Sequence, residues 1–207
     1  MLSTLRIPIV QQCNDNQELF VEIKDSNIIE TACSLFQNDE YPEEYRTITI
    51  QFIEGCCINN CLREFTLKTI KRIGYSEFIC IDENYPAEIK KSLFVIISYY
   101  LDYYGFHAAE LTFDCYILHF IVDIIEANSE IALDVLEKIM HYYDEKGRLK
   151  EILFNDDFPA ILDSLEKVYE TSTDIEENRI DHFLEYYKQV STSDKQSGLS
   201  SASILNL

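Results

Sequence analysis

The sequence predicts an all-α protein of about seven to nine helices. One reason is a recurring phrase in which an apolar pair, an acidic turn and an aromatic residue precede proline, and three of the four prolines lie in it. Proline at the first turn of a helix loses no hydrogen bond, and acidic residues there face the positive end of the helix dipole. A second reason is that 207 residues contain only five glycines and four prolines, which favours long helices. The phrase occupies residues 35–42, 79–86 and 153–159.

The spacing of apolar residues then places each helix. A cap at Asp25 and Ser26 separates the first two, and the next one follows Pro42. Residues 47–53 alternate like a strand, but helix is favoured because a single strand would have no hydrogen-bonded partner. Helices are expected at 17–24, 27–37, 43–57, 58–73, 86–104, 107–126, 129–145, 159–170 and 175–190.

The helix at 86–104 is apolar almost all round, which predicts a central position covered on most sides. Glycine is expected to end three helices, because it adopts positive φ without a steric penalty. The helix at 129–145 is expected to begin at Asn128 and Ser129 and to carry a narrow polar stripe. The three terminating glycines are Gly74, Gly105 and Gly147.

Periodicity is lost from Ser191, where serine, threonine, glycine and glutamine dominate. Such a composition cannot bury enough apolar surface to offset the entropy of ordering. We therefore expect one helical domain over 1–190 and a flexible serine-rich tail over 191–207.

The first two copies of the phrase lie 44 residues apart, and the segment 154–165 leads from a short acidic loop and proline into a leucine-rich helix. In these features residues 17–190 resemble the armadillo and HEAT family of helical repeats, whose units span roughly 40–47 residues. The resemblance implies a right-handed α-solenoid, or a compact helical bundle, used for protein contacts. The third copy comes 73 residues later, and the chain lacks tryptophan, so the tryptophan-based peptide recognition of importin-α-like members is not carried over.

The formal charge of −20 excludes several classes of partner. Binding a phosphate backbone requires lysine and arginine to replace counterions, so nucleic acid and anionic membranes are not expected to bind. A basic protein or peptide is the expected partner. The N-terminal residues Met1–Pro8 do not resemble a secretory signal, and the odd count of seven cysteines indicates a reducing compartment. The cytoplasm is expected, with the nucleus as the alternative.

No motif predicts a cofactor or a catalytic centre, and the chain is not expected to be an enzyme. The densest cysteine group, Cys56, Cys57 and Cys61, has no second pair at the spacing of a zinc site, so these thiols are interpreted as core residues. His119 and Asp123 share a helix face but have no second histidine on the same turn. They are interpreted as part of a polar groove.

These observations predict a non-catalytic scaffold whose concave face binds an extended partner segment. The alternative is a compact helical enzyme or small-ligand carrier, because tyrosines cluster at 99–104 and 142–143. The sequence also leaves open that the chain is part of a longer solenoid, since Leu19, Phe20 and Ile23 in the opening helix are apolar. The predicted protein-binding residues are Asn60, Glu64 and Lys68 in one unit and Tyr116, His119, Asp123 and Glu126 in the next.

Overall fold

The computed structural model describes residues 17–170 and 178–188. All regular structure within these ranges is helical, and they contain no strand, which confirms the all-α class. The predicted tail at 191–207 lies outside the described residues. The helices are α2 (Gln17–Asp25), α3 (Ile28–Gln37), α4 (Glu43–Ile58), α5 (Arg63–Ile73), α6 (Tyr75–Ile79), α7 (Ala87–Tyr104), α8 (Phe106–Asp114), α9 (Ile117–Ala127), α10 (Ser129–Glu145), α11 (Leu149–Leu153), α12 (Phe158–Tyr169) and a last helix at 178–188.

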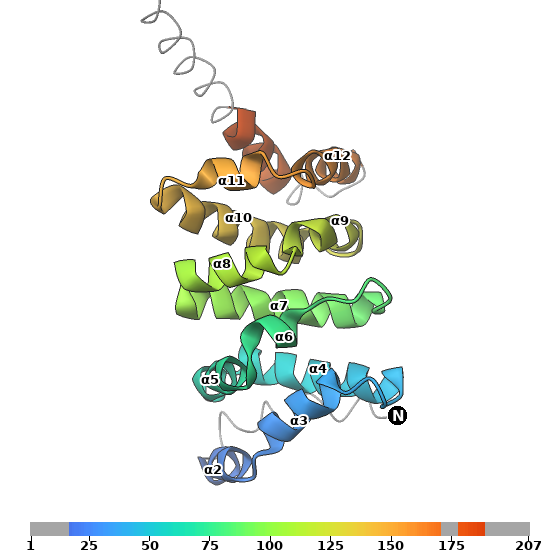
Figure 1. The fold of residues 1–207 in the computed structure, drawn as a ribbon, viewed down its shortest axis with the longest axis vertical. Helices are drawn as coiled ribbons and strands as arrows, with labels where there is room; N and C mark the ends of the chain where they lie inside the picture. The colour runs from blue at the N-terminus through green and yellow to red at the C-terminus, as the bar shows by residue number, and fades with distance from the viewer. Residues whose placement is uncertain (1–16, 171–177, 189–207) are drawn as a thin grey trace, which may run out of the picture.

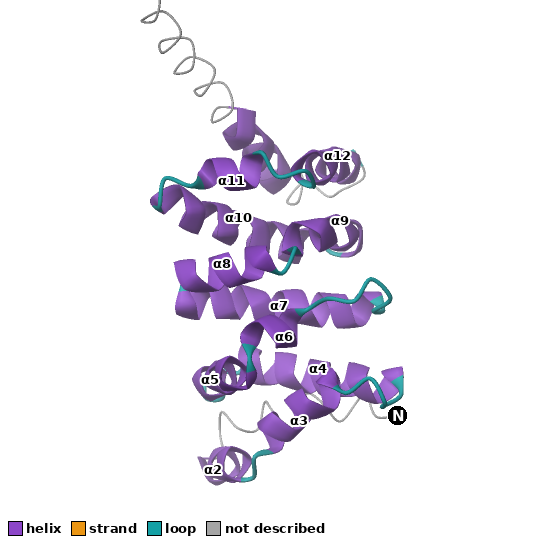
Figure 2. Cartoon of the chain, in the orientation of Figure 1, coloured by secondary structure: helices purple, strands orange, loops and turns teal. Residues whose placement is uncertain are grey.

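The helices follow one another along the long axis of the molecule in chain order, from α2 at one end to α12 and the helix at 178–188 at the other (Figure 1). Short loops connect most neighbours (Figure 2). Each helix contacts helices close to it in the sequence: α3 packs on α4, α4 on α7, and α7 on α10. The chain therefore builds an elongated array of layers.

Three long helices, α4, α7 and α10, form the continuous part of this array. Their first residues are Glu43, Ala87 and Ser129, so successive starts are 44 and 42 residues apart. Ser98 and Asp102 of α7 bond to Asp134 and Lys138 of α10, and both pairs are 36 residues apart. A constant offset means that the two helices run in the same direction. Figure 1 shows α4, α7 and α10 all running from right to left.

Bonds between side chains of different layers repeat the same separation along the chain. Arg46 bonds to Tyr85, Glu54 to Ser92, and Tyr75 to Thr112, at separations of 39, 38 and 37 residues. Other bonds between layers span from 33 to 49 residues, so each layer is bonded to the next at a separation close to the 42–44 residues between the starts of the long helices. They join Glu30 to Arg72, Lys90 to Asp123, Glu110 to Arg148, His119 to Asp157, and both Glu130 and Glu137 to Arg179.

The core runs continuously through the layers. Leu93, Phe94 and Ile97 of α7 are fully buried, as the apolar surface of this helix predicts. The rings of Tyr75 and Tyr100 are stacked with centroids 3.6 Å apart, and both tyrosines are buried. The hydroxyl of Tyr75 meets Thr112 Oγ1 at 2.7 Å, so its polar end is satisfied inside the core.

The described residues contain twelve helices, so the prediction of seven to nine is wrong. Residues 107–126 form two helices, because the chain turns at Cys115 and Tyr116, where Tyr116 has a left-handed φ of 57°. The helix expected at 58–73 begins only at Arg63, and Ile58 is the last residue of α4. Two further helices, α6 and α11, have five residues each and were too short to show an apolar period.

Most predicted helix ends are confirmed. Residues 43–57 are helical despite their alternating pattern, and Gly74, Gly105 and Gly147 all have positive φ at helix ends. The Asn128 side chain accepts a hydrogen bond from the backbone N–H of Ile131 at 3.1 Å, which caps α10.

One predicted helix start differs from the structure. The residue before α3 is Asn27, in a left-handed conformation, while Ser26 instead donates a hydrogen bond to the carbonyl of Ile23. The third copy of the proline phrase begins α12, which is not one of the long parallel helices. The long helix α10 begins instead with an asparagine cap, which explains why the third copy of the phrase does not continue the 44-residue spacing of the first two.

Tyr100→Ala should test the stacked tyrosines. Removing a buried ring leaves a cavity, and we expect the free energy of unfolding to fall by about 3–5 kcal/mol in urea denaturation. Tyr41→Ala is the matched control, because Tyr41 is exposed and should change stability by at most about 0.5 kcal/mol. Equal effects of the two substitutions would contradict this packing.

Candidate functional site

Asn60, Glu64 and Lys68 lie at the junction of α4 and α5 and along α5. The Asn60 side chain accepts a hydrogen bond from Arg63 at 2.9 Å, and Lys68 Nζ lies 2.6 Å from Glu64 Oε1. The hydrogen bond from Lys68 lowers the pKa of Glu64. These exposed side chains therefore already have partners within the chain: Asn60 bonds to Arg63, and Glu64 pairs with Lys68.

Tyr116, His119, Asp123 and Glu126 lie at and along α9. Tyr116 is exposed in the turn before the helix, and His119 Nδ1 lies 3.3 Å from Asp157 Oδ1 at the start of α12. Asp123 accepts a hydrogen bond at 2.7 Å from Lys90 of α7. Glu126 is exposed near the C-terminal end of α9.

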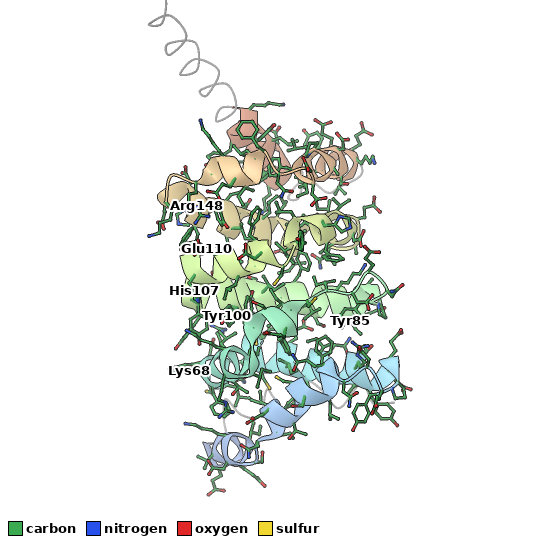
Figure 3. All side chains as sticks on the ribbon, in the orientation of Figure 1. Lys68, Tyr85, Tyr100, His107, Glu110 and Arg148 are labelled. Atoms are coloured by element: carbon green, nitrogen blue, oxygen red, sulfur yellow. The ribbon has the colours of Figure 1, made fainter. Side chains whose placement is uncertain are left out.

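The structure does not bring these two groups together on one surface. In Figure 1, α5 lies at the left edge of the array and α9 at the right. Figure 3 shows Lys68, Glu110 and Arg148 along the left edge, whereas Tyr85 lies on the opposite side. A partner that reads both groups would have to pass across the width of α7.

The long helices form a cleft that the sequence analysis did not identify. It has a volume of about 440 Å³ and crosses from the end of α4 over α7 and α10 to the helix at 178–188. Its apolar part comes from Ile58, Val95 and Ile131. The cleft is lined by Ile58, Lys91, Val95, Ser98, Tyr99, Asp102, Asn128, Glu130, Ile131, Asp134, Lys138 and Arg179.

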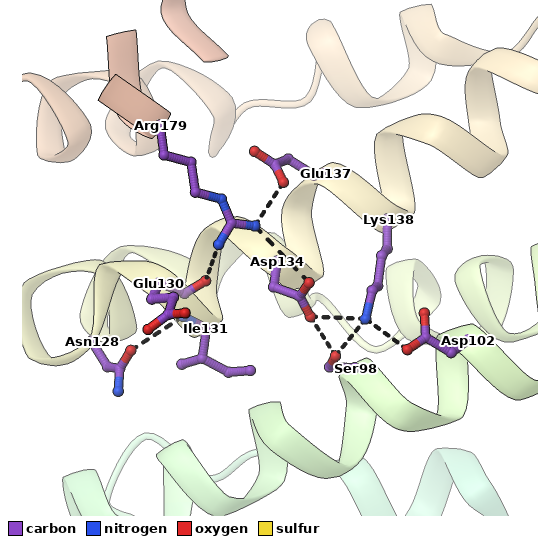
Figure 4. A network of polar contacts seen from close by, with 9 residues as sticks. All are labelled: Ser98, Asp102, Asn128, Glu130, Ile131, Asp134, Glu137, Lys138 and Arg179. Atoms are coloured by element: carbon purple, nitrogen blue, oxygen red, sulfur yellow. Dashed lines mark hydrogen bonds and ion pairs between the residues drawn. The ribbon is translucent and has the colours of Figure 1, made fainter. Parts of the chain in front are cut away.

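A polar network fills one side of this cleft (Figure 4). Lys138 Nζ lies 2.7 Å from Ser98 Oγ and 2.9 Å from both Asp102 and Asp134. The Ser98 hydroxyl donates to Asp134. Four groups from α7 and α10 therefore satisfy one another.

Arg179 extends the network to the last described helix. Its guanidinium lies 2.7 Å from a Glu137 oxygen and donates a hydrogen bond to the backbone carbonyl of Glu130. The hydrogen bond to Glu137 is the main cause of the raised pKa of Arg179. The contacts of Arg179 with Glu130 and Glu137 thus attach the helix at 178–188 to α10.

The electrostatics of Lys138 follow from its half-buried position. Desolvation is the largest single influence and would lower its pKa. Hydrogen bonds and charge interactions with Asp134 and Asp102 together outweigh it, so the pKa of Lys138 is raised. A lysine that holds its proton this firmly does not serve as a base toward Ser98.

Three ion pairs between or beside the layers have the cation inside and the carboxylate outside, whereas in the Arg72–Glu30 pair the arginine is the more exposed partner. Arg46 is 13% exposed and its partner Asp39 is 85% exposed, at an Nη1–Oδ1 distance of 3.1 Å. Lys90 is 10% exposed against 55% for Asp123, and Lys138 is 22% exposed against 52% for Asp102. In these three pairs the cation is largely buried and contacts the fold, and the carboxylate lies at the surface.

Exposed carboxylates also gather where the long helices begin. They belong to the first turns of α4, α7 and α10, to the loops before them and to the end of α9, which lie at the right side of the array in Figure 1. We call this set the acidic edge. It consists of Asp39, Glu40, Glu43, Glu44, Asp82, Glu83, Glu88, Asp123, Glu126 and Glu130.

The cysteines of α3 and α4 are core residues. Cys33, Cys56 and Cys57 are fully buried, and burial raises the pKa of the Cys33 thiol to about 12 and also raises that of Cys57. Such thiols are poor nucleophiles and poor metal ligands. Among the described residues, no three histidine, cysteine or acidic side chains are arranged to hold a metal ion.

Comparisons with protein-family models, with curated proteins and with solved structures give no match to this chain. In the described ranges no helix has the length and apolar character needed to cross a membrane. The functional assignment therefore depends on the surfaces described above.

The sequence did contain a signal for the cleft. The polar stripe predicted on the helix at 129–145 includes Asp134 and Lys138, whereas Ser98 and Asp102 lie in the helix at 86–104 that was predicted to be covered on most sides. The equal offset of 36 residues between Ser98 and Asp134 and between Asp102 and Lys138 is visible in the printed sequence. This offset predicts contacts between the two pairs only once α7 and α10 are known to be parallel neighbours.

Lys138→Met should leave Asp102 and Asp134 without their shared cation. We expect a loss of about 1–2 kcal/mol in the free energy of unfolding, because the pair is partly solvated. Lys68→Met, which removes an exposed pair within α5, should change the stability far less, because that pair is fully solvated.

The difference in free energy of unfolding between the native protein and Lys138→Met should depend on pH in a defined direction. A raised lysine pKa adds stability at pH values below the unfolded pKa of about 10.4, and this stability is lost as the pH rises through the folded pKa. The difference between native protein and Lys138→Met should be constant between about pH 7 and pH 9 and should shrink above that range. Urea denaturation at a series of pH values measures it.

Alkylation of the native protein should distinguish the cysteines. Cys61 and Cys80 are exposed and should react with iodoacetamide at neutral pH, while Cys33, Cys56 and Cys57 should react only after unfolding. Peptide mass spectrometry of protein labelled before and after denaturation provides the readout. Native labelling of Cys57 would show that α3 and α4 do not pack as described.

Proposed function

We propose that this chain is a non-catalytic protein-interaction scaffold built as an armadillo-like, right-handed stack of helices. The starts of α4, α7 and α10, 44 and 42 residues apart, support the proposal because armadillo and HEAT units span roughly 40–47 residues. The bonds between layers, which reach from 33 to 49 residues along the chain, also support it. Stacked units of this kind offer long surfaces rather than single pockets.

The proposed binding surface is the acidic edge together with the adjoining cleft on the long helices. Glu130 belongs to both, so the two form one continuous region. The apolar side chains of Ile58, Val95 and Ile131 can receive apolar groups of a partner. The charges of Lys138 and Arg179 are already paired within the chain, so a partner does not have to neutralise them.

The observation that carries the proposal is that the cation lies inside and the carboxylate outside in three ion pairs. Because Arg46, Lys90 and Lys138 are directed inward, the carboxylates paired with them remain available at the surface. A partner with lysine and arginine side chains would find complementary charge along several layers. The predicted partner is therefore a basic protein or peptide.

The residues predicted from the sequence contribute unequally to this surface. Asp123 and Glu126 belong to the acidic edge, and His119 and Tyr116 precede them on α9 and in the turn before it. Asn60, Glu64 and Lys68 lie away from this edge, and the proposed surface does not use them.

The alternative of an enzyme or small-ligand carrier was suggested by the clustered tyrosines. Tyr100 stacks on Tyr75 and contacts the Tyr104 ring with centroids 4.4 Å apart, and Tyr143 packs against Phe106 and Phe113. Core packing therefore accounts for Tyr100 and Tyr143, whereas Tyr99 lines the cleft and Tyr103 is exposed. The scaffold is preferred to the alternative because the charged groups of the cleft are paired with one another.

A reducing compartment such as the cytoplasm fits the cysteines. The six described cysteines are not in disulfide bonds, and three of them are fully buried. Such thiols persist where glutathione and thioredoxin keep cysteine reduced.

A charge-reversal variant tests the proposed surface. Glu43→Lys, Glu88→Lys and Glu126→Lys together should reduce capture of basic proteins from a native lysate by about tenfold or more, because close charge pairs contribute strongly to association. Capture by the native chain should also weaken as ionic strength rises, since exposed charges are screened beyond about 8 Å at physiological salt. Crosslinking followed by mass spectrometry identifies and quantifies what is captured.

The matched control changes the net charge equally at another place. Glu77, Asp181 and Glu185 are exposed and lie outside the acidic edge. Reversing these three should leave capture within about twofold of the native chain if binding is local, since distant rim charges act mainly through the general field. Equal losses in both variants, or capture that does not respond to salt, would refute the proposal.

A further inference from the structure

A small notch lies between the α8–α9 turn and the loop before α12. Its volume is about 180 Å³, below the roughly 300–1,000 Å³ of small-molecule pockets, so it suits a single side chain. The His119–Asp157 contact joins its two sides, and the Asn155 side chain accepts a hydrogen bond from the Asp157 backbone N–H at 2.9 Å. The notch is lined by Phe113, Asp114, Tyr116, Leu118, Asn155 and Asp157.

One lining residue of the notch and one residue next to the lining in the sequence are unusually exposed aromatics. Tyr116, which lines it, is 77% exposed, and Phe154, which directly precedes the lining residue Asn155, is 75% exposed. They are 38 residues apart, the same separation as His119 and Asp157, so they occupy corresponding turns of successive layers. Neither ring is used to fill the core, although large rings contribute most when buried.

The backbone at Tyr116 adds to this picture. Its φ of 57° and ψ of 31° lie in the left-handed region, which is easier for glycine or asparagine than for tyrosine. A tyrosine that is both conformationally costly and solvent-exposed gives the fold no evident benefit. Its ring is nevertheless positioned beside the carboxylates of the notch.

The charge of the notch selects its occupant. Asp114 and Asp157 both line it, and the described part of the chain contributes neither lysine nor arginine to the lining. A flat cation can stack on an aromatic ring while donating hydrogen bonds to carboxylates. Guanidinium combines both abilities better than ammonium, because it is planar, weakly hydrated and matched to carboxylate geometry.

We propose that the notch binds an arginine side chain of the partner, with its guanidinium between the Tyr116 ring and the carboxylates of Asp114 and Asp157. Phe154 then covers the aliphatic part of the same segment. This inference rests on the proposed function, since it names the residue by which a basic partner is recognised. The inference places an arginine contact outside the acidic edge, at the turn that directly precedes α9.

The test is an NMR titration of the full chain with the tripeptide acetyl-Gly-Arg-Gly-amide. Amide signals of Tyr116, Asn155 and Asp157 should shift on titration. The citrulline peptide, which keeps the shape but lacks the charge, should bind at least about tenfold more weakly, and the lysine peptide should be intermediate.

Two variants separate binding from folding. Tyr116→Gly suits the left-handed backbone, so it should retain the fold and lower affinity about 3- to 30-fold, the range expected for one cation–π contact. Asp157→Asn should lower it to a similar extent through loss of charge. Tyr45→Ala and Asp163→Asn, at exposed positions elsewhere, should leave affinity unchanged within about twofold.

The location of the shifts distinguishes failure of this inference from failure of the proposed function. Shifts confined to the acidic edge, such as Glu43 and Glu88, would overturn the arginine notch while leaving a basic partner in place. An equal response to the citrulline peptide, or unchanged affinity in both notch variants, would also overturn it. Failure of charge reversal to affect partner capture would instead remove the proposed function.

Discussion

The rest of the structure depends on the packing of each long helix on the next. Because α4, α7 and α10 are parallel and in contact, their apolar faces form one core, and the shorter helices fill the spaces between layers. A single layer could not bury these faces alone, since an isolated helix of this length is only marginally stable in water. The contacts of Ser98 with Asp134 and of Asp102 with Lys138 are a direct consequence of this parallel register.

The charged residues show how a chain with 17 basic and 37 acidic side chains forms a stable fold. Arg46 illustrates the arrangement: its guanidinium contacts the Phe36 carbonyl at 3.0 Å and the Tyr85 hydroxyl at 2.6 Å, and it also pairs with Asp39. One cation thereby connects the end of α3, the start of α4 and the loop before α7. Placing scarce cations at such joints leaves the excess carboxylates at the surface, where water hydrates them and a cationic partner can reach them.

The sequence predicted the helical class and most helix ends because these depend on local chemistry. Pro42, Pro86 and Asn128 mark the starts of the long helices, and Gly74, Gly105 and Gly147 lie at helix ends. The break at Tyr116 could not be predicted, because no glycine or proline marks it and the residues on both sides keep a helical apolar pattern.

The candidate site was predicted only in part for a related reason. Asp123 and Glu126 were recognised because they are polar residues on an otherwise apolar helix. The cleft network depends on which helices are neighbours, and the start of α10 at Asn128 carries no copy of the proline phrase that would mark it as the next long helix. Residues such as Ser98, isolated in an apolar segment, reveal their role only through a partner 36 residues away.

The short reach of the bonds between layers has a mechanical consequence. Since each layer is fastened only to segments about forty residues away in the chain, closing these contacts never requires distant ends to meet, and the entropy lost in loop closure stays small. A disturbance at one end is passed on only through each intervening interface in turn. The helices at either end of such an elongated array can unfold locally while the central layers stay folded. A bound partner that spans several layers would therefore stabilise the terminal layers against local unfolding.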